Sequence, residues 1–354
     1  MPSFRAPVNS SFVEGMDEFV AYHKVNMILG AATTVINLLL LFVLCASSSL
    51  RKKSEGSIFQ ILIVLCLADG MNCFSICLMG LNRVLLYTEV IDTLTIPIRT
   101  SWECALEPWL LFRGYGDLWP PTVQLAMGVD RCLAVFNPIS YNKRASKRKG
   151  IFFFATIICV TLELSVGYLI SWSTRFVKVK YWCGRKAAFG NSYASFVYGM
   201  NIVCYLLAFV LTMICYFKSK YYMDTCSAKQ HLARIRYQLM ISLLSIVLIS
   251  TPNGISLFAQ YIAEVADAVA KTSTYLTCVN SAINIVVYLL LHKEFRSEFV
   301  RIIFRKTECT TVAVTITLND KCVLYCSLQT EQVLRDDELI GSDETARNTP
   351  EDKK

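Results

Sequence analysis

The sequence predicts an all-α membrane protein, a seven-transmembrane helix bundle with its N-terminus outside and a short amphipathic eighth helix. Its 354 residues are 54% hydrophobic and only 18% charged, with a mean hydropathy of +0.45, whereas soluble proteins carry about 25% charged residues. A helix needs about 20 apolar residues to cross the membrane core. Segments of this length lie at 25–46, 58–81, 106–136, 151–172, 193–217, 237–262 and 272–291.

The distribution of basic residues between the loops predicts the orientation. With the N-terminus outside, the cytoplasmic loops carry 18 Lys and Arg residues, against ten on the opposite side, and basic residues favour the cytoplasm. Residues 1–24 lack the apolar core of a cleavable signal peptide, so the first span directs insertion. Asn9 begins an Asn-Ser-Ser sequon on this outer segment and is the candidate glycosylation site.

The segment after the seventh span predicts an amphipathic helix on the inner membrane surface. Its apolar residues at 295, 299, 302 and 303 lie on one face and its charges on the other. The following sequence is polar and mixed in charge, which is typical of disorder, and Cys309 is a candidate for acylation. The predicted divisions are 1–24, the extracellular N-terminus; 25–291, the seven-transmembrane domain; 292–305, the eighth helix; and 306–354, the cytoplasmic tail.

The cysteines predict one disulfide bond. Most of the 15 cysteines fall inside spans or on the cytoplasmic side, where they are interpreted as packing residues rather than metal ligands. Cys104 and Cys183 fall at the outer surface, and an oxidising exterior favours their pairing. This bond would join the outer end of the third span to the loop before the fifth.

Polar residues inside the spans predict one hydrogen-bonded network. Each needs a partner at its depth in the membrane; they are Asn37, Asp69, Asn280, Ser281 and Asn284. Two interpretations remain open: the network joins the helices, or rearrangement at Asp69 also shifts them between two states. Pro252 lies in the middle of the sixth span and predicts a kink there.

Asp130 and Arg131 form a charge pair where the third span meets a strongly basic loop at 142–149. Ionisable residues at such a boundary are candidates for function. The alternative is that the pair only ends the helix, since charged residues are common at helix termini.

The motifs resemble those of the rhodopsin-like G-protein-coupled receptors over about 25–305. The matching segments are Leu65 to Asp69, the Asp130-Arg131-Cys132 stretch with Pro138 and Tyr141, Asn280 to Tyr288, and Phe295-Arg296. Residues 128–141 are particularly similar to the nematode chemosensory receptors of the Srsx kind. The resemblance implies a multi-pass receptor of the plasma membrane, with sensory cilia as a candidate location.

The resemblance also implies how signalling works. Arg131 would pair with Asp130 at rest and turn toward a heterotrimeric G protein when active, with Tyr216, Asn284 and Tyr288 rearranging at the inner helix ends. Cys132 and Ile285 depart from the family pattern. Pro120 stands where many relatives carry a hydroxyl that helps to bind sodium, which disfavours a sodium site around Asp69 and leaves its presence open. No other metal ion and no cofactor is expected.

The resemblance places Arg113 where amine receptors carry a ligand-binding Asp, which disfavours an amine ligand. Arg113 either pairs internally, with Asp117 one turn along or with Glu163, or recognises an acidic or strongly polar ligand together with outer-loop residues such as Lys178. Counting from Cys104 instead places Leu111 in the pocket. Cys278 occupies the retinal-lysine position of opsins, so an opsin is excluded; Cys278 is a candidate ligand residue, with Arg113, Asp117 and Lys178.

Other function classes fit the sequence less well. An enzyme is not expected, because the three histidines lie outside the spans or at their edges. A seven-helix ligand-gated channel would have its N-terminus inside, and a transporter would show duplicated halves. The basic residues follow the membrane boundary, so nucleic acid is not an expected partner. The expected partners are a G protein, membrane lipid and a small molecule or short peptide; the oligomeric state stays open.

Overall fold

The computed structural model describes residues 5–47, 56–139, 141, 151–222, 226–258, 263–291 and 293–303. The chain divides into two compact units, residues 1–224 with 228–306 and residues 225–227 with 307–354, and the description below concerns the first unit. The candidate acylation site Cys309, the basic loop at 142–149 and the side chain of Tyr288 lie outside the described residues.

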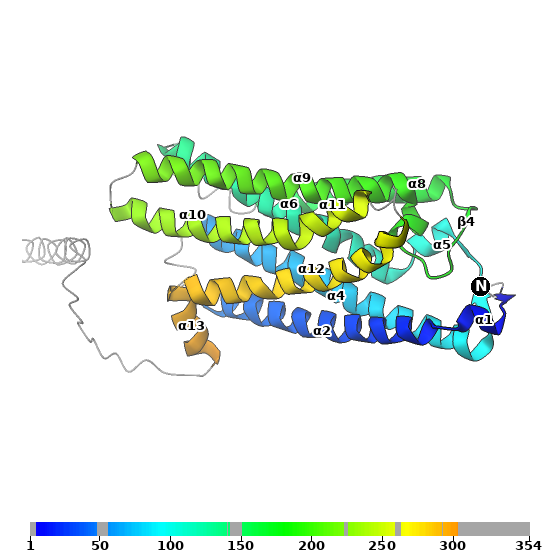
Figure 1. Ribbon diagram of the computed structural model, residues 1–354. Helices are drawn as coiled ribbons and strands as arrows, with labels where there is room; N and C mark the ends of the chain where they lie inside the picture. The colour runs from blue at the N-terminus through cyan, green and yellow to red at the C-terminus, as the bar shows by residue number, and fades with distance from the viewer. Residues whose placement is uncertain are drawn as a thin grey trace, which may run out of the picture. The chain divides into compact units, whose positions relative to one another are not determined.

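Helices make up most of the first unit (Figure 1). In chain order they are α1 Ser10–Val13, α2 Met16–Ala46, α4 Gly56–Thr93, α5 Ser101–Ala105, α6 Pro108–Phe136, α8 Ile151–Ser173, α9 Arg185–Tyr222, α10 Cys226–Ser245, η1 Ile246–Ser250, α11 Thr251–Phe258, α12 Ala263–Leu291 and α13 Lys293–Ile303. Several helices extend well past the apolar segments. The helix α4, for example, continues to Thr93, although its apolar segment ends at residue 81.

Two short antiparallel pairs of strands depart from the all-α prediction. They are β1 Arg5–Pro7 with β2 Thr95–Pro97, and β3 Arg99–Thr100 with β4 Lys178–Val179. Each joins segments far apart in the sequence, and no strand exceeds three residues, so periodicity could not reveal them.

Five helical segments among the described residues are long and apolar enough to cross a membrane. They are Ser10–Ala46, Leu62–Thr93, Ile151–Ser173, Arg185–Tyr221 and Ile235–Phe258. The exposed faces are apolar as well: on α8, Leu162 is 63% and Leu169 is 67% exposed, whereas Val160 and Leu164 are buried. Apolar faces of this kind belong against lipid, and the unit is a multi-pass membrane protein.

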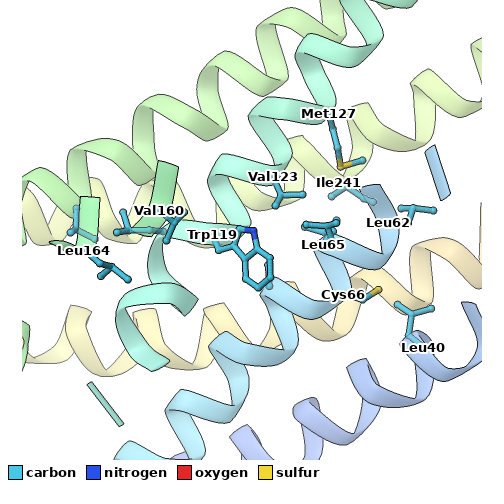
Figure 2. Packing of buried hydrophobic residues seen from close by; sticks show 14 of the residues in the cluster. Leu40, Leu62, Leu65, Cys66, Trp119, Val123, Met127, Val160, Leu164 and Ile241 are labelled. Atoms are coloured by element: carbon cyan, nitrogen blue, oxygen red, sulfur yellow. The ribbon is translucent and has the colours of Figure 1, made fainter. Parts of the chain in front are cut away.

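Large side chains from several helices meet at α6 in the core. Trp119, Val123 and Met127 of α6 lie between Leu65 of α4 and Val160 of α8 (Figure 2). The Trp119 indole donates to Thr156 Oγ1 at 3.3 Å, so its polar atom is satisfied. Because lipid tails are as apolar as these side chains, close packing and polar bonds hold such helices together more than exclusion from water does.

Two glycines bring the backbones of α2 and α4 into direct contact. A Cβ atom added at Gly30 would lie 2.6 Å from the Cys77 backbone nitrogen, and one at Gly80 would lie 2.7 Å from that of Met27. Small residues are the usual means of close helix approach in membranes. The two helices are therefore fixed against each other at both places.

The segment around Pro252 is irregular. A five-residue π-helical turn, η1, lies directly before α11, in which Pro252 is the second residue and is buried. The Thr251 backbone N–H and hydroxyl both reach the Ile246 carbonyl, five residues back. Proline clashes with the regular α-helical hydrogen bond at its position, and such π-turns are frequent at functional sites.

We expect Gly80→Ala to lower the free energy of unfolding by about 1–3 kcal/mol, because its new Cβ meets backbone atoms that cannot rotate away. Thermal unfolding of the purified protein in detergent measures this. Gly199→Ala is the matched control, since nothing lies within 4 Å of its added Cβ. Equal melting temperatures for the two variants would contradict the contact at Gly80.

Candidate functional site

A cavity of about 910 Å³ opens between the helices at one end of the unit. This is the end that carries Cys104 and Cys183, and we call it the disulfide end. Most charged residues along the cavity wall are cationic: in the described chain, one carboxylate, Asp117, lines it together with Arg83, Arg113, Lys178, Lys180, Arg185 and Lys186. Cavities of this size hold small organic molecules.

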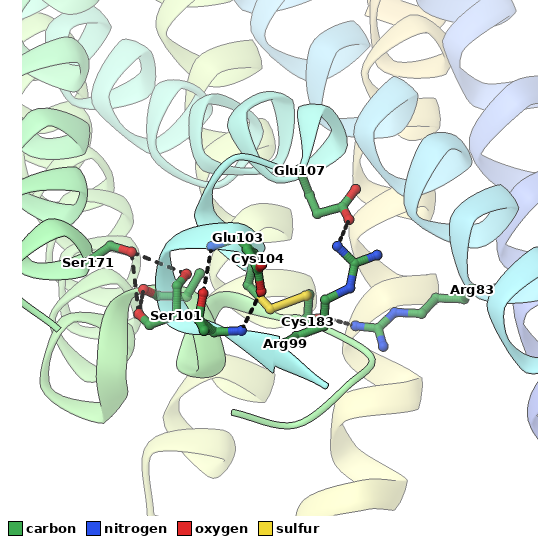
Figure 3. The surroundings of a disulfide bond; sticks show 10 residues. Arg83, Arg99, Ser101, Glu103, Cys104, Glu107, Ser171 and Cys183 are labelled. Carbon is green, nitrogen blue, oxygen red and sulfur yellow. Dashed lines mark hydrogen bonds and ion pairs between the residues drawn. A yellow bond between two sulfur atoms is a disulfide. The ribbon is translucent and has the colours of Figure 1, made fainter. Parts of the chain in front are cut away.

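The Cys104–Cys183 disulfide fixes the cover of this cavity (Figure 3). It ties α5, whose first turn is closed by a reciprocal cap between Thr100 and Glu103, to the segment before α9. The Ser101 hydroxyl donates to the Ala188 carbonyl at 2.7 Å and strengthens this attachment. The segment from Lys178 to Lys186 is thus held at the mouth of the cavity.

Aromatic side chains pack beneath this cover. Tyr181 lies edge-on to Tyr87 of α4 and to the neighbouring Trp182. Burial beside Tyr87 raises the pKa of Tyr181 to about 12, even though Arg83 acts in the opposite direction. The Tyr181 hydroxyl therefore stays protonated around neutral pH.

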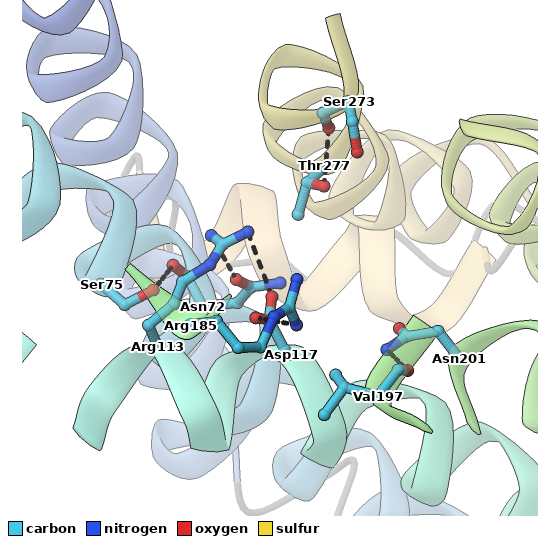
Figure 4. A network of polar contacts seen from close by, with 9 residues as sticks. All are labelled: Asn72, Ser75, Arg113, Asp117, Arg185, Val197, Asn201, Ser273 and Thr277. Carbon is cyan, nitrogen blue, oxygen red and sulfur yellow. Dashed lines mark hydrogen bonds and ion pairs between the residues drawn. The ribbon is translucent and has the colours of Figure 1, made fainter. Parts of the chain in front are cut away.

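A charged cluster lies in the cavity wall (Figure 4). Asp117 Oδ1 lies 3.1 Å from Arg113 Nη2, and Asp117 Oδ2 lies 2.7 Å from Arg185 Nη1. Arg113 also donates to Asn72 Oδ1 at 3.3 Å. A single carboxylate thus serves two guanidinium groups, and the cluster keeps a net positive charge.

The structure brings only some of the predicted ligand residues together. Arg113, Asp117 and Lys178 line the cavity. Cys278 is completely buried and is not a lining residue, although the adjacent Thr277 is. Leu111 is 42% exposed and does not line the cavity either. Between the internal pairs considered for Arg113, the structure has Asp117 rather than Glu163.

The predicted polar residues inside the bundle form three connections, all of which end on α12. Asn37 of α2 donates to Ser281 Oγ at 2.7 Å, and Asn284 donates to Asp69 Oδ2 at 2.6 Å. The third reaches Asn280, which accepts from Ser245 at 3.2 Å, and Ser245 accepts from Gln124 of α6 at 2.9 Å. These bonds link α2, α4, α6 and α10 to one helix.

The charge pair predicted from the sequence lies near the opposite end of α6, which we call the Arg131 end. Arg131 Nη2 is 3.5 Å from Asp130 Oδ2, with both side chains buried. The Tyr141 hydroxyl donates toward both Asp130 oxygens, at 3.2 and 3.1 Å. A carboxylate buried this deeply requires such partners, and Tyr141 provides one from beyond the helix.

Other residues at the Arg131 end are arranged differently. Cys132 Sγ lies 3.2 Å from Cys215 Sγ of α9. The Tyr216 ring lies edge-on to Phe217, and its centroid is 5.9 Å from the Arg236 guanidinium. Within the described chain, no hydrogen bond or ion pair joins Tyr216 to Arg131. The side chain of Tyr288 is not described, and Asn284 lies away from this end, bonded to Asp69.

The helix α13 carries the predicted amphipathic pattern. Phe295 is buried against the bundle core, with Phe299 and Ile302 packed beside it, while Arg296 and Arg301 are exposed. Glu298 accepts from Ser47 at 2.7 Å, which links α13 to the end of α2.

Comparison with known families decides the identity of the chain. Residues 27–303, from within α2 to the end of α13, match the family described as the serpentine type 7TM GPCR chemoreceptor Srsx. The chain belongs to the Srsx family. It is a G-protein-coupled chemoreceptor, as the motifs indicated, and the channel and transporter interpretations are not favoured. This is not a family of enzymes, and no curated protein matches the receptor.

Sequence reasoning missed several residues that the structure places at these sites. Arg83 and Trp109 both line the cavity. Arg83 follows the second apolar segment, so the sequence alone indicates an ordinary basic residue of a loop. The motif includes Tyr141, but it does not predict that the Tyr141 hydroxyl donates to Asp130. The continuing apolar pattern after Gly80 was the available signal that the second helix extends past Arg83.

We expect Tyr141→Phe to raise basal G-protein activation several-fold, because Asp130 loses two hydrogen bonds that hold it beside Arg131 in this arrangement. Bonds to charged groups contribute about 1.5–3 kcal/mol, so the free energy of unfolding falls as well. Nucleotide exchange on a purified G protein measures the first effect. Tyr221→Phe on an exposed side chain is the control, and basal exchange equal in both variants would contradict the role of Tyr141.

Proposed function

We propose that α6 and α12 cross the membrane together with the five strongly apolar segments, which gives seven spans. The helix α6 is less apolar because it carries Arg113, Asp117, Asp130 and Arg131, and the partners of these residues offset the cost of placing charge in lipid. The bias of basic loops supports an extracellular N-terminus on residues 1–24 and a cytoplasmic tail from residue 306. In this arrangement α13 lies at the inner surface of the plasma membrane, including that of sensory cilia.

The receptor binds a small molecule or short peptide in the cavity at the disulfide end and signals through the Arg131 end. The observation that carries this proposal is the placement of a cation-lined cavity and a closed Asp130–Arg131 pair at the two ends of the same helix, α6. The ligand shifts α11 about the irregular turn before Pro252. Arg131 then leaves Asp130 and contacts the heterotrimeric G protein, with Tyr216 and Tyr288 rearranging beside it.

The polar bonds to α12 transmit this shift. Asp69, Asn284 and Asn280 connect α4 and α12, which line the cavity, with each other and with Ser245 of α10. Polar bonds of this kind between transmembrane helices are worth about 0.6–2 kcal/mol each. Ligand binding can therefore replace one set of these interhelical hydrogen bonds by another without unfolding the bundle.

We expect Arg131→Ala to abolish signalling while leaving the amount of receptor at the cell surface unchanged. Cells expressing the full chain are screened with small acids, odorants and short peptides, using cAMP and calcium as readouts, and each active compound is retested on the variant. Arg301→Ala, which removes an exposed cation from α13, is the matched control. Responses of wild-type strength from Arg131→Ala would overturn the assignment of the switch.

Glycosylation of Asn9 tests the orientation. Asn9 begins the one Asn-x-Ser/Thr sequon of the sequence. With the N-terminus outside, the receptor carries a glycan that a glycosidase removes, and Asn9→Gln and Ser11→Ala both lack it. Ser10→Ala keeps the sequon and should keep the glycan. A receptor that reaches the surface with no glycan on any variant would contradict the use of Asn9 as the acceptor site.

A further inference from the structure

Charge in the cavity wall is strongly unbalanced, and this restricts the chemistry of the ligand. Among the described lining residues there are six cations and one carboxylate. Lys178, Lys180 and Lys186 lie on the cover, where they attract anions from solution. An amine ligand would meet repulsion at the mouth and again at the wall.

The cationic side chains in the wall are not equivalent. Arg113 and Arg185 share Asp117, and Arg113 also donates to Asn72. Asp117 thus offsets one of their two charges, and each of them has a carboxylate in direct contact. Arg83 has no carboxylate in direct contact: Glu107 acts on it electrostatically but forms its ion pair with Arg99, at 3.4 Å, and no ion pair within 4.0 Å joins Arg83 to an acidic residue of the described chain.

Arg83 is nevertheless buried, with 6% of its surface exposed. Its Nη2 donates to the Cys183 carbonyl and its plane lies over the Trp109 ring, 5.6 Å from the centroid. The Tyr87 hydroxyl interacts with the same guanidinium. Its Nη1 has no hydrogen-bond partner in the part of the chain that the structure describes. Burying a charged group costs free energy unless each of its donors has an acceptor, and here a bound molecule can supply the missing acceptor.

Trp109, beside Arg83, also has a buried N–H donor without an acceptor in the described chain. It is 4% exposed and lines the same cavity, and the donor is its indole Nε1. Two buried N–H donors, one of them charged, thus lack acceptors in the same corner of the wall. Two oxygens on one planar group, as in a carboxylate, match such a pair.

We propose that the ligand of this receptor is a small organic acid, whose carboxylate is bound by Arg83 Nη1 and Trp109 Nε1. This proposal rests on the cavity being the ligand site. The remainder of the ligand is a short apolar or aromatic group, for which Met79, Leu110 and Ile249 offer apolar contacts. Amides and hydroxyls such as those of Asn201 and Thr277 line the same cavity. Arg83 provides the charge, and the Cys183 carbonyl orients it.

The test measures binding to the purified full-length receptor in nanodiscs, by the shift in its thermal unfolding temperature, so that no G protein is required. The probes are acetate, hexanoate and 3-phenylpropanoate at neutral pH, each beside its neutral amide, with hexylamine and inorganic phosphate as further arms. We expect hexanoate or 3-phenylpropanoate to raise the unfolding temperature, and their amides to be at least tenfold weaker.

Variants identify the site. Arg83→Gln is expected to weaken binding of the acid at least tenfold, and Trp109→Phe, which keeps the ring and loses the N–H, several-fold. If Arg83→Gln does not fold, Arg83→Lys, which keeps a charge but cannot keep both the Cys183 bond and a forked contact, takes its place. Arg175→Gln is the matched control, because this outer cation stacks on Trp172 and Phe176 and does not line the cavity.

Several outcomes would overturn the proposal. They are no shift with any of the acids, equal shifts for the acid and its amide, a shift with phosphate alone, or binding of the acid that survives the loss of Arg83. Binding of hexylamine or a neutral amide instead would reject the acid while leaving the receptor function in place. The Arg131→Ala experiment tests that function separately.

Discussion

The interior of the membrane contains almost no water, and this constraint governs where every polar group in the receptor lies. A buried charge or amide needs a partner in the protein or in a molecule bound to it. Asp69 accepts from Asn284, Asp130 lies between Arg131 and Tyr141, and Asp117 lies between two arginines. Because Asn284, Tyr141 and Arg185 come from segments other than those of the carboxylates they bind, these bonds also fix how the helices are rotated and placed.

The sequence predicted the course of the chain well, because hydropathy is a local property. The apolar segments coincide with helices of the structure, five of which are long and apolar enough to cross a membrane, and the orientation drawn from the basic loops stays a prediction. The ends of the helices were less accessible: α4 runs twelve residues past its apolar segment, to Thr93, because a helix continues wherever its own backbone bonds are kept. The strands at Arg99–Thr100 and Lys178–Val179 depend on a contact across the fold, which no local pattern records.

The sequence predicted groups of residues for the sites, but not which of them bond to each other. Polarity at a given depth indicated that Asn280 needs a partner, but its bond to Ser245 depends on the rotation of α10 about its axis. The same limit applied to arginines in the cavity. Arg113 is conspicuous within an apolar span, yet it pairs with Asp117. Arg83 lies just past a span and is buried without a direct ion pair in the described part of the chain. Composition identifies a charge, and only packing decides whether it is neutralised.

The contact of α2 with α4 through Gly30 and Gly80 has a mechanical consequence for the receptor. It leaves these helices no room to slide, and Arg83 stands on α4 less than one turn from Gly80. Across the cavity, Asn253 and Ser256 stand on α11, which joins the rest of its span through the π-helical turn. One wall is therefore held by backbone contact, and the other joins its span through an irregular turn. In the proposed mechanism, the width of the gap between them is what a bound molecule sets.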